Sequence, residues 1–450
     1  MFKRKINDHL IRWSKQKQRK PLVIRGARQV GKTTTVHQFA ENFNNYLYLN
    51  LDLPAERKIF ERELSTSDLL QALFIEKNIN PAHGSTLIFI DEIQNSPRAV
   101  SYLRYFYEEF PDYYFIAAGS LLEIMLASNT INFPVGRVEF CYLYPLSFEE
   151  YLLARDKKLV LEQYNTLPVS PLAHPQLIKL FHDYSLIGGM PEVLVKFLES
   201  GNMVEAQGIM DNLMTAFTDD FRKYAKSSAA IGYLMHVIDT APLFAGQRIK
   251  FAGFGNSTYR YREMAEALRT LEQAMLVTLL YPTTTFEPPL RPDIKKSPKL
   301  QFFDTGLMNF RAGLQSYFYK FDDLHNFHRG LVAEHIVYQE IIASDLHTNR
   351  KPLFWVREER RSSAEVDYLL NIDSFLIPVE VKSGATGRLR SLQQFIDGTN
   401  HRFAIRLYAG PLKIDDLRTV KGKSYRLLNL PYYLAGKLND YGHWFINLGR

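Results

Sequence analysis

The sequence contains almost no cysteine, since Cys141 is the only one in 450 residues. A single cysteine excludes an intrachain disulfide framework and a zinc site built from cysteines, and it suits a reducing compartment. The apolar runs, such as Leu87–Ile90, are far shorter than the roughly 20 residues that cross a bilayer. The basic first 20 residues lack the apolar stretch of a secretory signal. We therefore expect a cytoplasmic protein without a membrane partner.

An excess of charge of one sign is also missing. The chain has 55 Lys and Arg against 48 Asp and Glu, a net charge of +7, which permits nucleic-acid binding without requiring it. Hydrophobic residues make up 46% and charged residues 23%, as in a globular protein, so disorder as the main state is excluded. The length indicates roughly three domains.

Residues 1–145 alternate short apolar runs with helical patterns. This alternation predicts an α/β domain, in which a parallel sheet is covered by helices on both faces. The expected strands are Leu22–Arg25, Tyr46–Leu51, Thr86–Ile90, Tyr113–Ala118 and Val138–Tyr142.

The rest of the chain divides into three further regions. Residues 146–230 have helical periodicity without strand signals, broken by prolines and by Gly188–Gly189, which predicts a helical lid. Residues 231–299 contain helices with basic residues and a proline-rich connector. Residues 300–450 return to mixed strands and helices, predicting a second α/β domain.

The strongest motif is Gly26-Ala27-Arg28-Gln29-Val30-Gly31-Lys32-Thr33, which fits G-x-x-x-x-G-K-[ST]. It follows an apolar run and precedes a helical pattern, which is the required setting for a phosphate loop. The glycines let backbone N–H groups turn around phosphate oxygens. Lys32 should bridge the β- and γ-phosphates of ATP, and Thr33 should hold Mg²⁺. The expected nucleotide-binding residues are Gly26, Ala27, Arg28, Gln29, Val30, Gly31, Lys32, Thr33 and Thr34.

Two acids end the apolar run that begins at Leu87. Adjacent carboxylates at the end of a buried strand are costly unless a cation or a polar site receives them. Asp91 is expected to reach Mg²⁺, and Glu92 to orient and polarise the attacking water.

These motifs resemble a prokaryotic AAA+ ATPase group with an uncharacterised carboxy-terminal domain. The resemblance covers residues 20–150 and rests on GARQVGKTT, FIDEIQ, AAGSLLE, VGRVEF and LYPLSFEEY. It implies that Ser120 is a polar sensor, that Arg137 is a sensor or an arginine finger, and that Arg28 lines the phosphates. A finger acting in trans would require a homo-oligomer. A helix cap for Ser120 and a surface position for Arg137 remain open.

A second group of charged residues lies in Glu365-Val366-Asp367 and Glu380-Val381-Lys382. A hairpin with its turn at Asp373-Ser374 would place Val366 opposite Val381 and form one apolar face. Asp367 would then lie opposite Glu380, about 5 Å away, where Mg²⁺ or Mn²⁺ could offset the repulsion. Lys382 could stabilise charge developing on a phosphate.

This second pattern resembles the PD-(D/E)xK nuclease superfamily. The resemblance assigns Asp367 as the D and Glu380-Val381-Lys382 as the E-x-K, with Glu334 as the acid from an earlier helix. It implies metal-dependent phosphodiester cleavage, with DNA as the expected substrate. A surface hairpin with ion pairs such as Glu365–Lys382 is the alternative. Pro378 cannot donate to a ladder, so its edge should be free or bulged.

The middle segment has two interpretations. Tyr261, Met264, Ala265, Leu268 and Leu271 form an apolar helical face, as in a winged helix that presents basic residues to DNA. A helical packing module with a solvated basic face fits equally well. The basic residues concerned are Lys250, Arg260, Arg262, Arg269, Lys295, Lys296 and Lys299.

Taken together, the sequence favours an Mg²⁺-dependent ATPase coupled to a nuclease-like or DNA-binding carboxy-terminal domain. The alternative is an ATP-driven conformational switch whose carboxy-terminal domain binds DNA or a protein without cleavage. A regulatory scaffold that has lost hydrolysis is a third class, and the presence of Glu92 argues against it.

Overall fold

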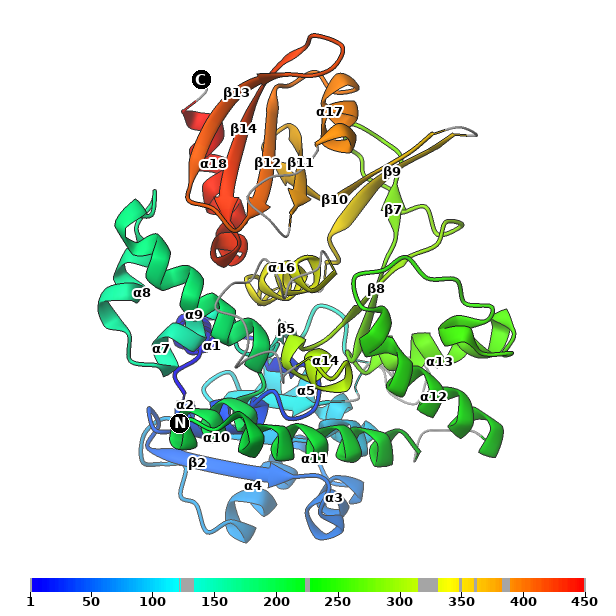
Figure 1. The fold of residues 1–450 in the computed structure, drawn as a ribbon. Helices are drawn as coiled ribbons and strands as arrows, with labels where there is room; N and C mark the ends of the chain where they lie inside the picture. The colour runs from blue at the N-terminus through cyan, green and yellow to red at the C-terminus, as the bar shows by residue number, and fades with distance from the viewer. Residues whose placement is uncertain are drawn as a thin grey trace.

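The computed structural model describes residues 2–120, 122, 133–222, 227–314, 331–347, 350–359, 362–382 and 389–448. It contains a five-stranded sheet (sheet A), a seven-stranded sheet (sheet C) and a two-stranded sheet. Figure 1 shows sheet A at the bottom, sheet C at the top and helix α16 (Leu331–Ala343) between them. None of the described helices has the length and apolar character needed to span a membrane.

Sheet A is the parallel sheet that the sequence predicts. Its strands follow the order β2-β3-β4-β1-β5, and every neighbouring pair is parallel. The strands are β1 (Leu22–Arg25), β2 (Asn45–Asn50), β3 (Thr86–Asp91), β4 (Tyr114–Gly119) and β5 (Glu139–Tyr142). All five expected strands are present, with ends that differ by one residue at most.

Helices cover both faces of sheet A because successive residues of a strand point to opposite sides. Leu22 and Ile24 join a cluster with α1 (Ile6–Ser14) and α2 (Lys32–Ala40). Val23, between them, packs on the other side with α3 (Pro54–Glu61), α4 (Thr66–Glu76) and α5 (Pro97–Glu109). This arrangement confirms the predicted α/β layers.

Between residues 146 and 222 the structure has helices and no strand. They are α7 (Phe148–Ala154), α8 (Lys158–Asn165), α9 (His174–Ile187), α10 (Pro191–Ser200) and α11 (Met203–Arg222). The expected break at Gly188–Gly189 separates α9 from α10. Gly188 has a φ of +82°, and a Cβ there would lie 2.4 Å from the Asp304 carboxylate, so the turn requires glycine.

The middle segment contains α12 (Ser228–Thr240), α13 (Tyr261–Gln273) and strand β6 (Val277–Leu280), which pairs antiparallel with β8 (Lys299–Phe302). The predicted apolar face of α13 is buried at Met264, Ala265, Leu268 and Leu271. Tyr261 is an exception, because it begins the helix and is 58% exposed. The expected boundary between residues 299 and 300 falls inside β8.

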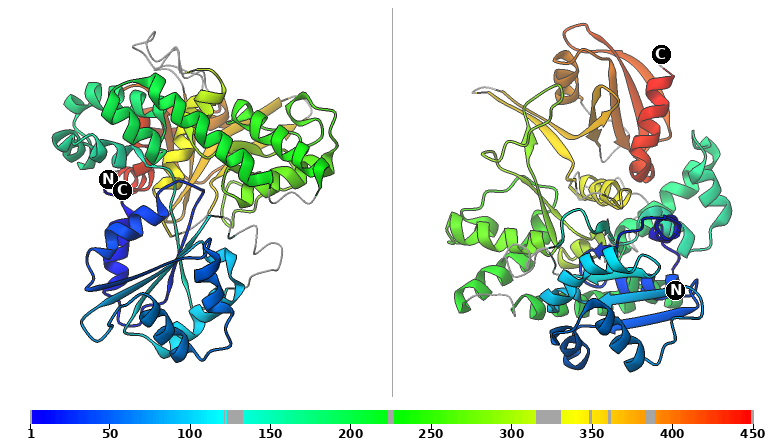
Figure 2. Two further views of the ribbon diagram at one scale, coloured as in Figure 1. Left: turned by 90° about the horizontal axis from the view of Figure 1, so that it is seen from below. Right: turned by 180° about the vertical axis from the view of Figure 1, so that it is seen from behind.

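Sheet C is mixed and follows the order β13-β14-β12-β11-β10-β9-β7. Its strands are β7 (Pro282–Thr283), β9 (Leu353–Glu359), β10 (Ser362–Ile372), β11 (Phe375–Val381), β12 (Phe403–Tyr408), β13 (Lys413–Arg418) and β14 (Ser424–Pro431). Helices α17 (Arg390–Asp397) and α18 (Leu438–Asn447) contact it. Figure 2 shows the same arrangement from behind. Strand β7 comes from the middle segment and pairs with β9, so the two regions share one sheet.

Candidate functional site

The loop from Gly26 to Gly31 connects β1 to α2 and depends on its two glycines. A Cβ at Gly26 would lie 2.2 Å from the Leu143 carbonyl oxygen, so no side chain fits there. Gly31 precedes α2 with a φ of +94°, in the left-handed region that favours glycine. The structure therefore places a tight glycine loop at the amino end of a helix, as the motif predicts.

Lys32 lies under this loop and is 6% exposed. Its Nζ donates hydrogen bonds to the Gly26 oxygen at 3.0 Å and the Ala27 oxygen at 2.7 Å. Burial lowers the pKa of Lys32 to about 8, although Glu92 and Asp91 act in the opposite direction. The ammonium is thus held among loop carbonyls within the site that the motif assigns to phosphate.

Arg4 stabilises the loop through hydrogen bonds, a role that the sequence did not reveal. Its guanidinium donates to Val30 O at 2.9 Å, to Tyr144 O at 2.7 Å and to Glu150 Oε1 at 2.8 Å. Burial raises the pKa of Glu150, but Arg4 and two backbone N–H groups outweigh this effect and the pKa is lowered. Glu150 belongs to a capping box that starts α7, so Arg4 ties the loop to that helix.

Arg28, which the AAA+ resemblance places on the phosphates, forms an ion pair instead. Its guanidinium lies 3.0 Å from Asp220 Oδ1 on α11, and the Asp220 side chain is 3% exposed. A contact with phosphate would require Arg28 to leave Asp220. The pair links the loop to the helical region.

Asp91 and Thr33 lie side by side, although 58 residues separate them in the sequence. Asp91 ends β3, and its Oδ2 accepts a hydrogen bond of 2.6 Å from the Thr33 hydroxyl. A hydroxyl next to a carboxylate is a donor set that suits Mg²⁺. These two residues therefore fit the predicted Mg²⁺ site.

Glu92 follows Asp91 with a left-handed backbone, at a φ of +49°. Its Oε2 accepts a hydrogen bond of 2.5 Å from Gln94, and its N–H donates to Asp91 Oδ1 at 3.0 Å. Burial raises the pKa of Glu92, against the lowering effects of Gln94 and Lys32. The carboxylate is placed beside the loop and restrained by Gln94.

The two sensor candidates occupy different ends of sheet A. Ser120 directly follows β4, which lies between β3 and β1, and its buried hydroxyl has no hydrogen-bond partner among the described residues. Residues 121 and 123 of the AAGSLLE motif lie outside the described residues. Arg137 precedes β5, at the end of the sheet opposite the loop, and its exposed guanidinium lies 2.7 Å from Glu108. In this arrangement the Arg137 guanidinium pairs with Glu108, and its roles as a sensor and as an arginine finger in trans both remain predictions.

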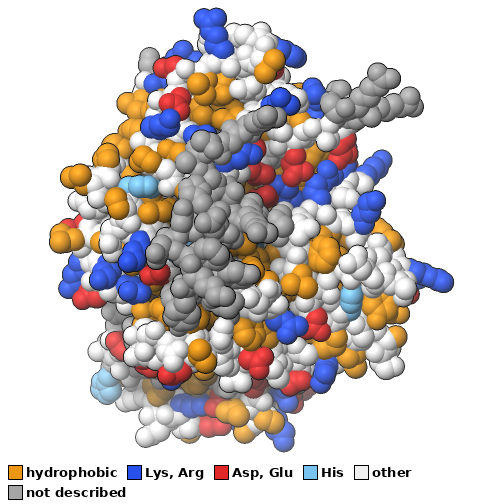
Figure 3. Space-filling view, viewed as in Figure 1, with side chains coloured by type: hydrophobic (Ala, Val, Ile, Leu, Met, Phe, Trp, Pro, Cys, Tyr) orange, Lys and Arg blue, Asp and Glu red, His pale blue; other side chains and the backbone are white. Residues whose placement is uncertain are grey.

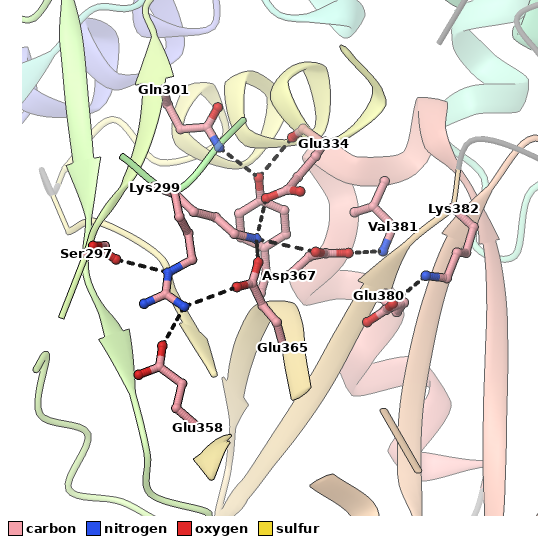
Figure 4. A network of polar contacts seen from close by, with 12 residues as sticks. Ser297, Lys299, Gln301, Glu334, Glu358, Glu365, Asp367, Glu380, Val381 and Lys382 are labelled. Atoms are coloured by element: carbon pink, nitrogen blue, oxygen red, sulfur yellow. Dashed lines mark hydrogen bonds and ion pairs between the residues drawn. The ribbon is translucent and has the colours of Figure 1, made fainter. Parts of the chain in front are cut away.

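The carboxy-terminal acids surround a lysine that sequence analysis did not include among them. Figure 4 shows Lys299, from β8, pointing into the group. Its Nζ lies 2.6 Å from Glu334, 2.7 Å from Glu365 and 3.4 Å from Asp367, and its side chain is 2% exposed. Burial lowers the pKa of Lys299, but the three carboxylates outweigh this effect and the pKa is raised. Burial also raises the pKa of Glu334 to about 8.

The predicted hairpin register holds only in part. Tyr368 pairs with Val379 and Leu370 with Ile377, as expected for a turn at Asp373-Ser374. The β10–β11 ladder ends at the pair Tyr368 and Val379, so the expected pair of Val366 with Val381 is not part of it. The register between β9 and β10 shifts between Val366 and Leu369. Beyond Pro378, strand β11 pairs with β12 from Val379 onward, so Pro378 does not interrupt that ladder.

Because the β10–β11 ladder ends at Tyr368 and Val379, Asp367 does not form a ladder pair with Glu380. Asp367 Oδ2 instead accepts a hydrogen bond of 2.8 Å from the Val381 N–H. Glu380 pairs with Lys382 at 2.5 Å, while its Oε2 is buried without a described partner. Burial, followed by Asp367, raises the pKa of Glu380 to about 8. The alternative Glu365–Lys382 ion pair is absent from the described contacts, since these residues pair with Lys299 and Glu380.

The described acids surround an ammonium group and form no three-carboxylate metal site in this arrangement. No three of these described carboxylates offer oxygens within 4.8 Å of one another. The Lys299 ammonium lies among Glu334, Glu365 and Asp367, and the Lys382 ammonium pairs with Glu380. In this arrangement, two lysines compensate acids to which the sequence assigns Mg²⁺ or Mn²⁺.

Several basic residues of the middle segment are used within the molecule rather than on its surface. Lys299 is buried, and Lys296 and Arg248 each lie 2.6 Å from Glu358. The predicted contact of Lys296 and Lys299 with DNA phosphates is therefore unsupported in this arrangement. Lys250, Arg260, Arg262, Arg269 and Lys295 are exposed. On the face in Figure 3, acidic and basic side chains are interspersed among the described residues.

Three family models match separate parts of the chain. Residues 178–317 match a domain of unknown function, DUF8612, and residues 329–420 match another, DUF4143. A solved structure of a Walker-type ATPase from Pyrococcus abyssi is similar over 69% of this chain and 96% of that chain, with 14% identity and a TM-score of 0.45. No curated protein matches. Residues 18–152 match the AAA domain, and with the loop geometry above they form an AAA-type P-loop ATPase domain.

Proposed function

We propose that this protein binds ATP at the loop between β1 and α2 and hydrolyses it with Mg²⁺. The observation that carries the proposal is the convergence of Lys32, Thr33 and Asp91 at the carboxyl ends of β1 and β3. The amino end of α2 and the loop amides would bind the phosphates. Lys32 would exchange its bonds to loop carbonyls for bonds to phosphate oxygens.

Thr33 and Asp91 would hold Mg²⁺, which when bound neutralises phosphate charge. Glu92 would orient the attacking water and accept its proton once its carboxylate leaves Gln94. Ser120 follows β4, the strand between β3 and β1, and its hydroxyl has no partner among the described residues, which suits a contact to this water or to phosphate.

Two variants test this assignment. Lys32→Ala should abolish nucleotide binding in calorimetry, because the phosphates lose their one buried ammonium. Glu92→Gln should bind ATP with affinity close to that of the wild type but turn it over about 10²-fold or more slowly. Lys17→Ala, which alters an exposed lysine of the same domain, serves as the control. Unchanged ATP affinity in Lys32→Ala would rule out the proposed site.

We propose that the carboxy-terminal domain has a nuclease-like site whose activity depends on the position of Lys299. Asp367, Glu380 and Lys382 would be its catalytic residues, with Glu334 as a further acid. Because Lys299 lies among three carboxylates, the second candidate, binding of DNA or a protein without cleavage, is favoured for the arrangement described above. ATP would act on this domain through the contacts of the loop with α7 and α11.

A nuclease assay distinguishes the two candidates for the carboxy-terminal domain. Wild-type protein and Asp367→Ala should be incubated with DNA and Mn²⁺ or Mg²⁺, with and without ATP. Cleavage by the wild type alone would establish the nuclease. DNA retention without cleavage by either protein, weakened as salt is raised, would establish binding alone.

A further inference from the structure

A second group of possible metal ligands shares no residue with either site described above. His9 comes from α1, Glu139 is the first residue of β5, and His347 follows α16. One ligand atom from each residue lies within 4.8 Å of the other two. His9 Nε2 is 3.6 Å from Glu139 Oε1, and the two imidazole rings are edge-on with centroids 4.6 Å apart.

His9 has an orphaned nitrogen that faces this group. The residue is 4% exposed, and its Nε2 has no hydrogen-bond partner in the part of the chain that the structure describes, because 3.6 Å to Glu139 is too long for one. A buried polar atom without a partner is costly and requires an explanation. Neutral imidazole is the form that binds metal ions.

We propose that His9, Glu139 and His347 bind a divalent transition-metal ion of the zinc type. Two imidazoles and one carboxylate are a donor set typical of Zn²⁺, whereas Mg²⁺ prefers oxygen ligands alone. Tetrahedral bonds of about 2.0–2.2 Å require ligand atoms roughly 3.4 Å apart. The ligand atoms of His9 and Glu139 are already close to this spacing. A small movement of the exposed His347 side chain would bring its ring nitrogen to the same distance.

The site joins segments that are distant in the sequence. The Tyr142 N–H of β5 donates to Leu346 O at 2.8 Å, so the segment that carries His347 is already attached to the edge of sheet A. An ion at this position would fasten the amino-terminal helix and sheet A to the chain that follows α16. The role is structural, and it is independent of ATP and of the carboxylates around Lys299.

The test uses the full chain without a histidine tag, stripped with a chelator and kept in excess Mg²⁺ without nucleotide. Co²⁺ is the spectroscopic probe, because nitrogen-ligated tetrahedral Co²⁺ absorbs strongly in the visible region, and Zn²⁺ should then displace it. Wild type should bind about one equivalent and gain thermal stability with Zn²⁺. His347→Ala and Glu139→Gln should each weaken binding at least tenfold.

His347 is exposed and Glu139→Gln is nearly isosteric, so these variants should fold, which circular dichroism will verify. His83→Ala, at an exposed histidine outside the group, should bind as the wild type does. Failure of the wild type to bind Co²⁺ or Zn²⁺ at micromolar concentrations would overturn the proposal. Equal binding by wild type, His347→Ala and Glu139→Gln would do so as well.

Discussion

At the scale of single residues, Lys32 illustrates how a phosphate-binding loop accommodates a buried charge. Its ammonium is held by two carbonyl oxygens, and burial lowers its pKa to about 8. Bound phosphate would raise this pKa again, because an adjacent anion favours the charged form. ATP affinity should therefore depend on the protonation of this one group.

We predict that ATP affinity begins to fall between pH 7 and 8, to roughly half its maximum at pH 8, and falls more steeply as the pH rises further. Above pH 8 the free protein loses the Lys32 proton and must regain it on binding, so affinity should fall by up to about tenfold per pH unit. Calorimetry across this range measures the effect. Lys32→Arg, which stays charged, is the control, and an equal fall in that variant would contradict the explanation.

Lys299 is the second informative residue, because its charge compensates three acids. We predict that Lys299→Met destabilises the fold by about 3–5 kcal/mol, since it leaves buried carboxylates without a partner. Mn²⁺ should recover part of the loss by taking the vacated position. Thermal unfolding with and without Mn²⁺ measures both effects, with the exposed Lys295→Met as control. A Lys299→Met protein as stable as the wild type, with no response to Mn²⁺, would contradict this role.

Residue-level prediction from the sequence succeeds where the chemistry is local. The spacing of Gly26, Gly31 and Lys32 identifies the loop because all its parts lie in one short segment. Arg4 and Lys299 escape this reasoning because their partners are 26 or more residues away in the sequence. Only tertiary packing shows that Arg4 meets Val30 and Glu150, or that Lys299 meets Glu334.

At the scale of elements, the Arg28–Asp220 pair makes α11 a partner of the loop. While the pair is intact, Arg28 is restrained away from the phosphates. If Arg28 exchanged Asp220 for a phosphate oxygen of ATP, the contact between the loop and the helical region would change. This exchange provides a physical path by which nucleotide binding could be coupled to the position of α11.

We predict that Asp220→Asn binds ATP several-fold more tightly, roughly 3- to 10-fold, because Arg28 is released toward the phosphates. The gain should disappear in the Arg28→Ala, Asp220→Asn double variant. Nucleotide titration of the four proteins of this cycle gives the coupling energy. If the Asp220→Asn gain persists without Arg28, the pair does not control nucleotide affinity.

Strand β10 shows what element-level sequence patterns can and cannot give. The alternation around Asp373-Ser374 yields the register of Tyr368 with Val379, because the turn and the apolar face agree. The register shift near Asp367 is not encoded in that alternation. The pairing of β11 with β12, a strand more than 20 residues further along the chain, is likewise absent from that alternation.

At the scale of the whole molecule, α16 connects the regions through one buried acid. Glu340 Oε1 accepts hydrogen bonds from the Phe148 N–H at 2.9 Å and the Tyr184 hydroxyl at 2.7 Å. Phe148 begins α7 and Tyr184 lies on α9, so the helix between the sheets is attached to the helical region. Burial raises the pKa of Glu340 to about 7.

This raised pKa predicts a pH dependence of the free energy of unfolding. The folded state holds the Glu340 proton more tightly than the unfolded state, so this contribution is present below about pH 4.5 and is lost as the pH rises through 7. Glu340→Gln should therefore gain stability relative to wild type between pH 5 and 8, by on the order of 1–3 kcal/mol. Denaturant unfolding measures the difference. Exposed Glu162→Gln should show no such trend, and a pH-independent difference for Glu340→Gln would refute the assignment.

The order in which the chain is synthesised limits when the Lys299 side chain can be buried among its three acids. Lys299 leaves the ribosome before Glu334, Glu365 and Asp367, and an uncompensated charge is costly to bury. Strand β8 therefore cannot reach its final environment during translation until about seventy further residues have emerged. The segment around β8 can therefore complete its folding only after the strands and helix that carry the three acids have been synthesised. The middle segment and the carboxy-terminal domain thus complete their folding together.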